Sequence, residues 1–364
     1  MRRGFARGAQ AVAACVVAAY ALAAGVILGA FTHAATAQAP TAASSAGRSA
    51  ATRGRVVADT LWSPALGTRK QFLVYLPPSY DRAPARRYAV AYYLHGLWGR
   101  ETDWTRQGRL DAAADSLAAL GRPELIVVMP DGDDSWYTTW NALGNADACR
   151  ADTTRREPAA SYCVPWPHYD EYVARDLVAR VDSAYRTRAD RAHRAVAGLS
   201  MGGYGAVSLA LRYPDVFAAA ASHSGVLSPL LAGPRLSPLL AGPRPFAVPA
   251  RWAPSVDSLR LLYGGYWTTL PLAMGRDTAA WWARDPGRLA ARVQRERPAL
   301  LPALFADVGT DDTLLGQNRA FRATLAALGV PLAYAEWPGA HTWAYWRAHV
   351  GESLAWVGAR IGAP

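Results

Sequence analysis

Short runs of consecutive apolar residues recur along the chain from about residue 55 onwards, each bounded by glycine, proline or polar residues. Runs of this length are typical of strands buried on both faces of a sheet. Segments with apolar residues at helical spacing lie between several of them. This order predicts an α/β fold, with a mostly parallel central sheet flanked by helices. The expected strands are residues 55–62, 70–76, 88–94, 125–129, 192–199, 217–222, 301–308 and 332–337.

The first two expected strands differ from the others in their pattern. Residues 70–76 alternate between two faces, and Pro77-Pro78 ends this strand. Alternation indicates one face that is only partly covered, so we expect an antiparallel pair at one edge of the sheet. The expected helices are residues 103–120, 168–186, a helix from 206 onwards, and 318–328.

The first forty residues follow a different pattern. Three arginines precede an apolar run over residues 11–31, and residues 35–37 and 37–39 both offer the small-x-small pattern of a secretory cleavage site. We therefore expect residues 1–39 to be a signal peptide of an exported protein, secreted or periplasmic. Pro40 disfavours cleavage after Ala39, which favours Ala37. The alternative is an uncleaved membrane anchor, because about 20 apolar residues can span a bilayer.

Residues 40–54 are rich in alanine, serine and threonine, as in a flexible linker, so the folded domain is expected over residues 55–364. Cys15 lies in the leader, which leaves Cys149 and Cys163. Two cysteines close in sequence in an exported chain favour a disulfide, with two free thiols as the alternative. Their spacing is not that of a metal site.

The chain has 364 residues, of which 51% are hydrophobic and 18% charged, an ordinary globular composition. Its net charge of +11 comes almost wholly from arginine, with Lys70 as the only lysine. The arginines are scattered and no nucleic-acid-binding module is visible. We therefore expect no nucleic-acid partner.

The pattern Gly-x-Ser-x-Gly occurs at residues 198–202, between an expected strand and an expected helix. That is the context of a nucleophile elbow, in which Ser200 would occupy a sharp turn. The bare pattern also arises by chance in glycine-rich loops, so its partners must decide. His95-Gly96 ends the strand 88–94, where this architecture supplies an oxyanion-hole amide. The expected oxyanion donors are the backbone N–H groups of Leu97 and Met201.

An acid and a histidine follow Ser200 in the order that this architecture requires. Asp312 follows the strand 301–308, and His341 follows the strand 332–337. We expect a triad of Ser200, Asp312 and His341, with Asp311 as the rival acid. His223 also ends a strand, but it precedes the acid-bearing strand and is not expected to be the base.

Residues 226–298 interrupt the strand pattern between the sixth and seventh strands of the sheet. The nonapeptide at residues 227–235 is repeated without change at 236–244, which indicates an insertion tolerated in a surface loop. We expect this segment to form a cap over the active site. The candidates for the substrate wall are Trp98, Trp136 and Trp343.

Several motifs together resemble one known family. They are Leu94-His95-Gly96, Met129-Pro130-Asp131-Gly132, Ser135-Trp136-Tyr137, residues 198–206, residues 309–312 and residues 339–346. These resemble the esterase D group of the α/β-hydrolase superfamily, which includes S-formylglutathione hydrolases, tributyrin-type, feruloyl and acetyl-xylan esterases, and mycolyltransferases. The resemblance implies the α/β-hydrolase fold and a serine carboxylesterase without a metal or organic cofactor.

The expected function is therefore an exported serine esterase acting through an acyl-enzyme. Its substrates would be short acyl or aryl esters, either small molecules or acetyl and feruloyl groups on polysaccharide. Export argues against the cytosolic S-formylglutathione hydrolase role. Two alternatives stay open: an acyltransferase that passes the acyl group to a sugar or lipid alcohol, and a non-catalytic binding protein on an esterase scaffold.

Overall fold

The computed structural model describes residues 53–139, 150–151, 163, 167–232, 251–252, 270–275 and 278–362. These residues all belong to one compact unit, Ala50–Pro364. The expected leader, most of the expected linker and the second copy of the nonapeptide lie outside the described residues.

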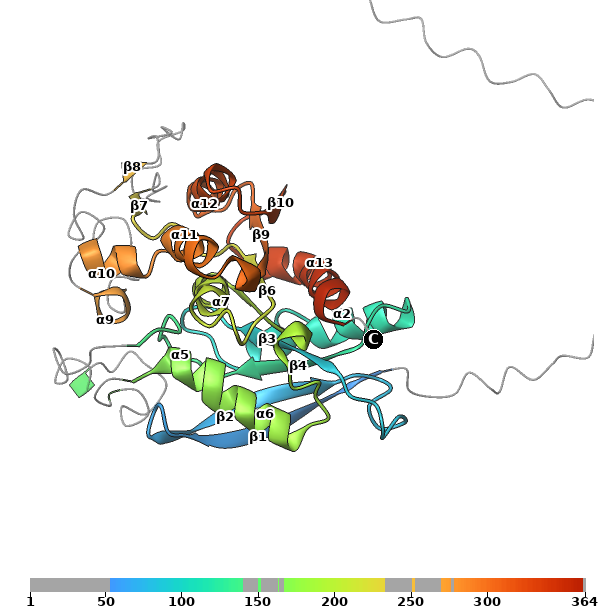
Figure 1. The fold of residues 1–364 in the computed structure, drawn as a ribbon. Helices are drawn as coiled ribbons and strands as arrows, with labels where there is room; N and C mark the ends of the chain where they lie inside the picture. Colours follow the sequence, from blue (N-terminus) through green and yellow to red (C-terminus); the bar gives the residue numbers. More distant parts are fainter. Residues whose placement is uncertain are drawn as a thin grey trace, which may run out of the picture. The chain divides into compact units, whose positions relative to one another are not determined.

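The centre of this unit is an eight-stranded sheet with the order β1-β2-β4-β3-β5-β6-β9-β10 (Figure 1). The strands β4, β3, β5, β6, β9 and β10 are parallel to one another. β2 pairs antiparallel with β1, which is the expected antiparallel pair at one edge, and also pairs antiparallel with β4. A short antiparallel pair, β7 (Leu231–Ala232) and β8 (Arg251–Trp252), lies outside this sheet. The sheet strands are β1 (Arg55–Ser63), β2 (Thr68–Leu76), β3 (Ala89–Leu94), β4 (Leu125–Pro130), β5 (Arg194–Leu199), β6 (Ala219–His223), β9 (Ala303–Gly309) and β10 (Leu332–Trp337).

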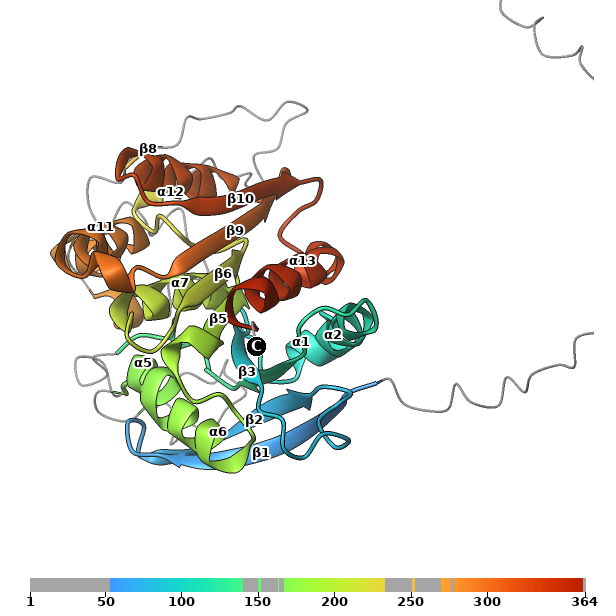
Figure 2. The same ribbon diagram turned by 45° about the vertical axis from the view of Figure 1, so that its right-hand side comes forward.

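Helices cover both faces of the sheet, as the turned view shows (Figure 2). One face carries α1 (Asp103–Arg106), α2 (Leu110–Ala119) and α13 (Trp343–Ile361). The other face carries α5 (Tyr169–Glu171), α6 (Val178–Ala184), α7 (Met201–Arg212), α11 (Pro286–Glu296) and α12 (Leu315–Ala327). Further helical segments in the described part of the chain are α9 (Leu270–Met274), α10 (Thr278–Ala283), a π-helical segment at Tyr172–Leu177 between α5 and α6, and 3₁₀ turns at Arg191–His193 and Pro298–Leu300. This arrangement is the α/β-hydrolase fold.

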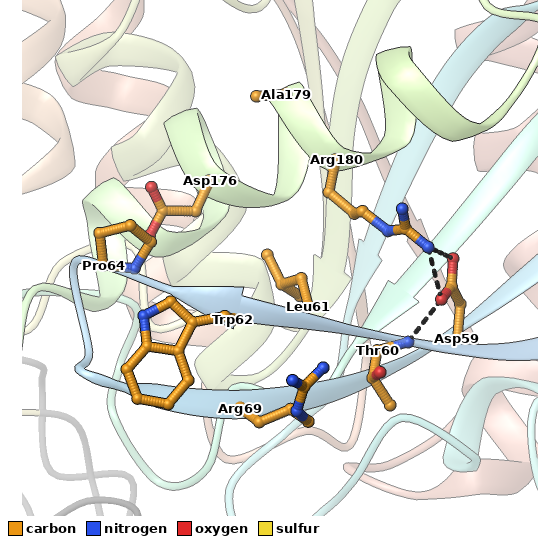
Figure 3. A pocket seen from close by; sticks show the side chains of 9 residues that line it. All are labelled: Asp59, Thr60, Leu61, Trp62, Pro64, Arg69, Asp176, Ala179 and Arg180. Carbon is orange, nitrogen blue, oxygen red and sulfur yellow. Dashed lines mark hydrogen bonds and ion pairs between the residues drawn. The ribbon is translucent and has the colours of Figure 1, made fainter.

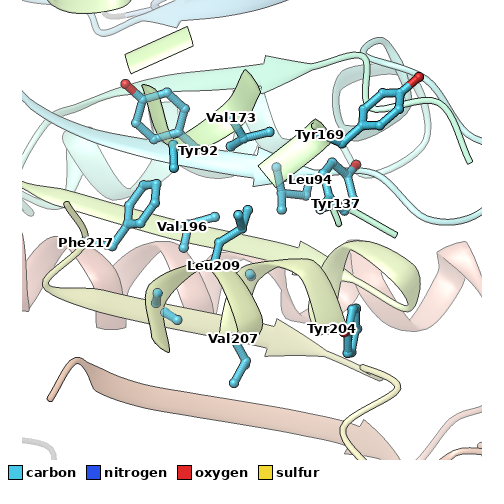
Figure 4. Close-up of a cluster of buried hydrophobic side chains, with 14 of the residues drawn as sticks. Tyr92, Leu94, Tyr137, Tyr169, Val173, Val196, Tyr204, Val207, Leu209 and Phe217 are labelled. Carbon is cyan, nitrogen blue, oxygen red and sulfur yellow. The ribbon is translucent and has the colours of Figure 1, made fainter. Parts of the chain in front are cut away.

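Successive residues of the central strands point into two different cores, because side chains alternate across a strand. On β3, Tyr92 and Leu94 pack under the helices around α7, whereas Tyr93 packs under α2 and α13. Figure 4 shows the first of these cores, in which Tyr92 and Leu94 lie near Val196 of β5 and Leu209 of α7. Burial on both faces explains why β3 and β4 contain no charged residue.

Two helical segments differ from the sequence-based expectation. The expected helix 103–120 is divided into α1 and α2, because Arg109 adopts a left-handed backbone conformation with φ of 53°. The buried Trp104 indole in α1 donates a hydrogen bond to the Leu94 carbonyl, so tertiary contacts fix the first turn in place. The long helix α13 was not predicted.

The last part of the expected cap forms α11, which packs against α7 and α12 and therefore belongs to the helical layer over the sheet. Asp285 precedes this helix and accepts a hydrogen bond from the Arg288 N–H at 3.0 Å. Its other carboxylate oxygen is buried without a partner among the described residues. Burial raises the pKa of Asp285 to about 6.

Asp285→Asn is expected to stabilise the protein above pH 6, because asparagine is an equally good N-cap and carries no charge to bury. The raised pKa means that Asp285 favours the folded state at low pH, and that this contribution is lost as the pH rises through about 6. The free energy of unfolding of the variant should therefore exceed that of the wild type by on the order of 1–2 kcal/mol at pH 7.5, and this difference should shrink towards pH 4.5. Urea unfolding at the two pH values measures this, and a difference independent of pH would contradict it.

Candidate active site

Ser200 lies at the turn between β5 and α7, with φ of 52° and ψ of −115°. A non-glycine residue with positive φ is strained and needs support from its surroundings. The backbone N–H of Ser200 donates a hydrogen bond to the His223 carbonyl at 2.9 Å, which ties the turn to the end of β6. The turn also needs Gly202, because a Cβ there would overlap the carbonyl oxygen of Leu94 and lie 2.5 Å from that of His95.

Gly202→Ala is expected to cost about 2–3 kcal/mol of stability, because the helix and β3 must move apart to admit the methyl group. The same movement would displace the Met201 amide and lower kcat. Gly351→Ala is the matched control, since Gly351 is in α13 and a Cβ there meets nothing within 4 Å. Alanine should stabilise that helix by up to ~1 kcal/mol. Thermal unfolding compares the two variants. A Gly202→Ala protein with the wild-type Tm would contradict the close approach of Gly202 to the Leu94 and His95 carbonyl groups.

The structure brings the side chains of Ser200, His341 and Asp312 together, although they come from three separate loops. His341 Nε2 lies 2.9 Å from Ser200 Oγ. His341 Nδ1 lies 2.9 Å and 3.1 Å from the two carboxylate oxygens of Asp312. The His341 side chain is 24% exposed and that of Asp312 is fully buried, so the hydroxyl end of the chain of hydrogen bonds faces outwards.

The geometry also distinguishes between the two candidate acids. Asp312 receives a backbone N–H bond from Leu314 at 2.8 Å, which fixes its carboxylate. The neighbouring Asp311 is exposed, and its contact with the histidine loop is a backbone bond from its N–H to the Gly339 carbonyl. Only Asp312 therefore places a carboxylate against the His341 ring. His223 is fully buried beneath this site and makes no side-chain contact with Ser200 among the described residues.

The loop after β3 presents the second expected amide. Gly132 donates its N–H to His95 Nε2 at 2.9 Å, so the proton of a neutral His95 is on Nδ1, which lies 2.7 Å from the Gly96 carbonyl oxygen. The Gly96 carbonyl and the Leu97 N–H belong to one planar trans peptide and point in opposite directions. Because the His95 ring binds the Gly96 carbonyl, the Leu97 N–H points away from that ring. Neither Leu97 nor Met201 donates its amide to an acceptor within the described ranges.

Asp134 and a buried group of charged residues hold this loop in place. Asp134 accepts a hydrogen bond from the Trp98 N–H at 2.6 Å, and Trp98 has a positive φ of 60°. The buried Lys70 ammonium lies 2.7 Å from an Asp131 carboxylate oxygen and 2.8 Å from an Asp133 carboxylate oxygen. Burial and the nearby Asp131 raise the pKa of Asp133 above its ordinary value. Two sequence features pointed to this cluster: Lys70 is the only lysine, and Asp131 belongs to the Met129–Gly132 motif.

The three candidate wall tryptophans occupy different environments. Trp98 is 61% exposed on the loop that carries Leu97. Trp343 is half-buried and packs edge-to-face against Trp346, whose ring contacts His341. Trp136 differs from the expectation, because it is only 2% exposed and packs against Tyr204 of α7. Its positive φ of 57° turns the indole into the core rather than along an open wall.

A groove of about 530 Å³ lies elsewhere, between the edge strand β1 and α6 (Figure 3). Its polar lining includes the Asp59–Arg180 ion pair, and three strands of the sheet, β2, β4 and β3, separate β1 from β5. It is therefore not part of the Ser200 site.

Three further sequence expectations concern metals, membranes and the cysteines. Within the described part of the chain, no three histidine, cysteine or acidic side chains are grouped so that they could hold a metal ion. No described helix is long and apolar enough to cross a membrane. Cys163 is buried, and Cys149 lies outside the described residues, so their disulfide stays a prediction.

Known proteins resemble this chain in sequence and in fold. A family model described as "Putative esterase" matches residues 63–357. Esterase Rv1288 of Mycobacterium tuberculosis is 29% identical over 284 residues, which are 76% of this chain and 53% of that protein. An endo-1,4-beta-xylanase/feruloyl esterase of Xylanibacter ruminicola is 30% identical over 168 residues, 45% of this chain and 20% of that protein.

Among solved structures, a ferulic acid esterase superposes with a TM-score of 0.60 and 26% identity, covering 85% of this chain and 99% of that one. The chain spans about half the length of the Mycobacterium tuberculosis relative that it matches, and a smaller share of the Xylanibacter protein.

Proposed function

The chain belongs to the putative esterase family, and from that premise we propose that it is a carboxylic ester hydrolase with Ser200 as its nucleophile. The observation that carries this proposal is the bridge made by the His341 ring. One nitrogen lies 2.9 Å from Ser200 Oγ, and the other contacts the buried Asp312 carboxylate. A hydroxyl whose proton can pass to an oriented imidazole is an activated nucleophile.

In the proposed reaction, His341 Nε2 takes the proton of Ser200 as Oγ attacks the ester carbonyl carbon. Asp312 holds the ring with its proton on Nδ1 and stabilises the imidazolium that forms. The amides of Leu97 and Met201 would donate to the oxyanion, which in comparable sites contributes about 3 kcal/mol per donor. His341 then protonates the leaving alcohol. Water, deprotonated by His341, releases the carboxylic acid from the acyl-enzyme and restores Ser200.

For the substrate, we propose short acyl or aryl esters, including acetyl and feruloyl groups on polysaccharide. The support comes from the names of two similar proteins, a ferulic acid esterase and a xylanase/feruloyl esterase. The exposed Trp98 indole beside the oxyanion loop would offer a flat apolar surface to an aryl acyl group. The leader pattern of residues 1–39 supports export, and the Cys149–Cys163 disulfide would suit that environment.

A panel of esters tests the substrate class. Hydrolysis of p-nitrophenyl acetate, p-nitrophenyl decanoate and methyl ferulate should be compared by kcat/KM, with a fluorophosphonate label mapped by mass spectrometry to the peptide that holds Ser200. We expect acetate and ferulate to be preferred over decanoate. A preference for the long chain would contradict the proposed substrate, and labelling at another residue would contradict the nucleophile. Preferential acyl transfer to an added alcohol would identify a transferase instead.

A further inference from the structure

A second group of polar side chains lies buried behind the triad, and the proposed mechanism does not use it. His223 Nδ1 lies 2.6 Å from an Asp307 carboxylate oxygen, and His223 Nε2 lies 2.7 Å from Ser353 Oγ. The Tyr93 hydroxyl extends the group to Ser353 at 3.0 Å. His223 and Asp307 are both completely buried, so no substrate can reach them. A buried carboxylate–imidazole pair is costly to desolvate and gives little net stability, which prompts the question of its role.

One end of this group contacts the nucleophile turn. His223 and Asp307 are register partners on the parallel strands β6 and β9. The His223 carbonyl accepts the Ser200 N–H, and the next residue, Ser224, donates its N–H to the Asp307 carbonyl at 2.7 Å. The position of Ser200 is therefore tied to the strand that carries Asp307.

The other end contacts the loop and helix that hold His341. The Tyr345 hydroxyl in the first turn of α13 donates to Asp307 Oδ1 at 2.9 Å. The Tyr345 ring lies so close to Gly339 that a Cβ there would be 2.7 Å from Cδ2, and Gly339 is two residues before His341. The adjacent Trp346 packs edge-to-face against His341, with ring centroids 4.9 Å apart.

Trp346 closes the connection back to β6. Its indole N–H donates to Ser224 Oγ at 3.2 Å. Trp346 therefore bridges the His341 ring and the residue that follows His223. Together these contacts connect the turn that carries Ser200 to the loop that carries His341.

We propose that Asp307 is a positioning residue for His341, acting through the Tyr345 hydroxyl and the first turn of α13. The proposal rests on the proposed function of Ser200 and His341. Asp307 fixes Tyr345, Tyr345 supports the Gly339 turn and orients Trp346, and both hold the imidazole at 2.9 Å from Ser200 Oγ. Since displacement of a reacting group by about 1 Å can lower a rate about 10²-fold, a modest loosening of this contact should be visible in kcat.

Tyr345→Phe tests the proposal, because it removes the hydroxyl bonded to Asp307 and keeps the ring. We expect kcat for p-nitrophenyl acetate and the rate constant for fluorophosphonate labelling to fall about 10-fold, with KM within twofold of the wild type. The final stoichiometry should stay at one label per chain. A merely structural role would lower the labelled fraction or the Tm and leave the rate constant per active site unchanged.

Tyr93→Phe is the matched control, because it removes a buried hydroxyl at the end of the same group that lies away from His341. The Tm of Tyr93→Phe should fall by about as much as that of Tyr345→Phe, while its kcat stays at the wild-type value. Asp307→Asn, where it folds, should lower kcat at least as much as Tyr345→Phe. Equal kcat values for Tyr345→Phe and Tyr93→Phe would overturn the proposal. A wild-type protein that fluorophosphonate does not label would instead contradict the proposed function.

Discussion

Replacement of Ser200 by alanine is expected to lower kcat for p-nitrophenyl acetate by about 10⁵-fold or more, because it removes the only atom that can form the acyl-enzyme. The loss of one hydroxyl leaves the oxyanion donors and the binding surface intact, so residual hydrolysis above the rate in water should remain. Steady-state kinetics of the purified variant measure the effect, and fluorophosphonate labelling should disappear with it.

Ser116→Ala provides the control for this substitution. Ser116 is an exposed serine of α2 whose hydroxyl bonds to the Ala112 carbonyl of its own helix, away from the triad. Its variant should hydrolyse the ester at the wild-type rate. If Ser200→Ala retained more than a few per cent of the activity of Ser116→Ala, the measured hydrolysis would come from another group.

Asp312→Asn is expected to lower kcat by about 10⁴-fold, with little change in KM. An amide can donate its N–H to His341 Nδ1, which favours the tautomer with the proton on Nε2. That tautomer cannot accept the proton of Ser200, so the hydroxyl is no longer activated. The kinetics should be measured together with circular dichroism. Asp312 also accepts a hydrogen bond from the Leu314 N–H, and loss of that hydrogen bond would loosen the loop.

The neighbouring acid supplies the matched comparison for this variant. Asp311→Asn makes the same chemical change one residue earlier, at an exposed side chain. Its kcat should stay within about twofold of the wild type, since the contact of Asp311 with the Gly339 loop is through its backbone. A large loss in Asp311→Asn and a small one in Asp312→Asn would exchange the two roles.

Much of the sheet could be predicted because central strands are buried on both faces. Such strands are mainly apolar, and this pattern is visible in residues 88–94, 125–129 and 195–199. Helix boundaries were harder to predict. The break between α1 and α2 lies at Arg109, whose left-handed backbone conformation is not indicated by the local sequence pattern. The resemblance to the esterase D group was confirmed by the family match over residues 63–357.

The sequence by itself predicted the order serine, acid, histidine, and the strand ends after which Ser200, Asp312 with its rival Asp311, and His341 would lie. Strand ends can be predicted because apolar runs stop where the chain leaves the sheet. The tertiary structure shows that the carboxylate of Asp312, and not that of the exposed Asp311, lies against the His341 ring. It also decided the burial of Trp136 and the Asp307–Tyr345 contact. These features depend on backbone dihedrals and on residues distant in sequence, so they exist only once the chain has folded.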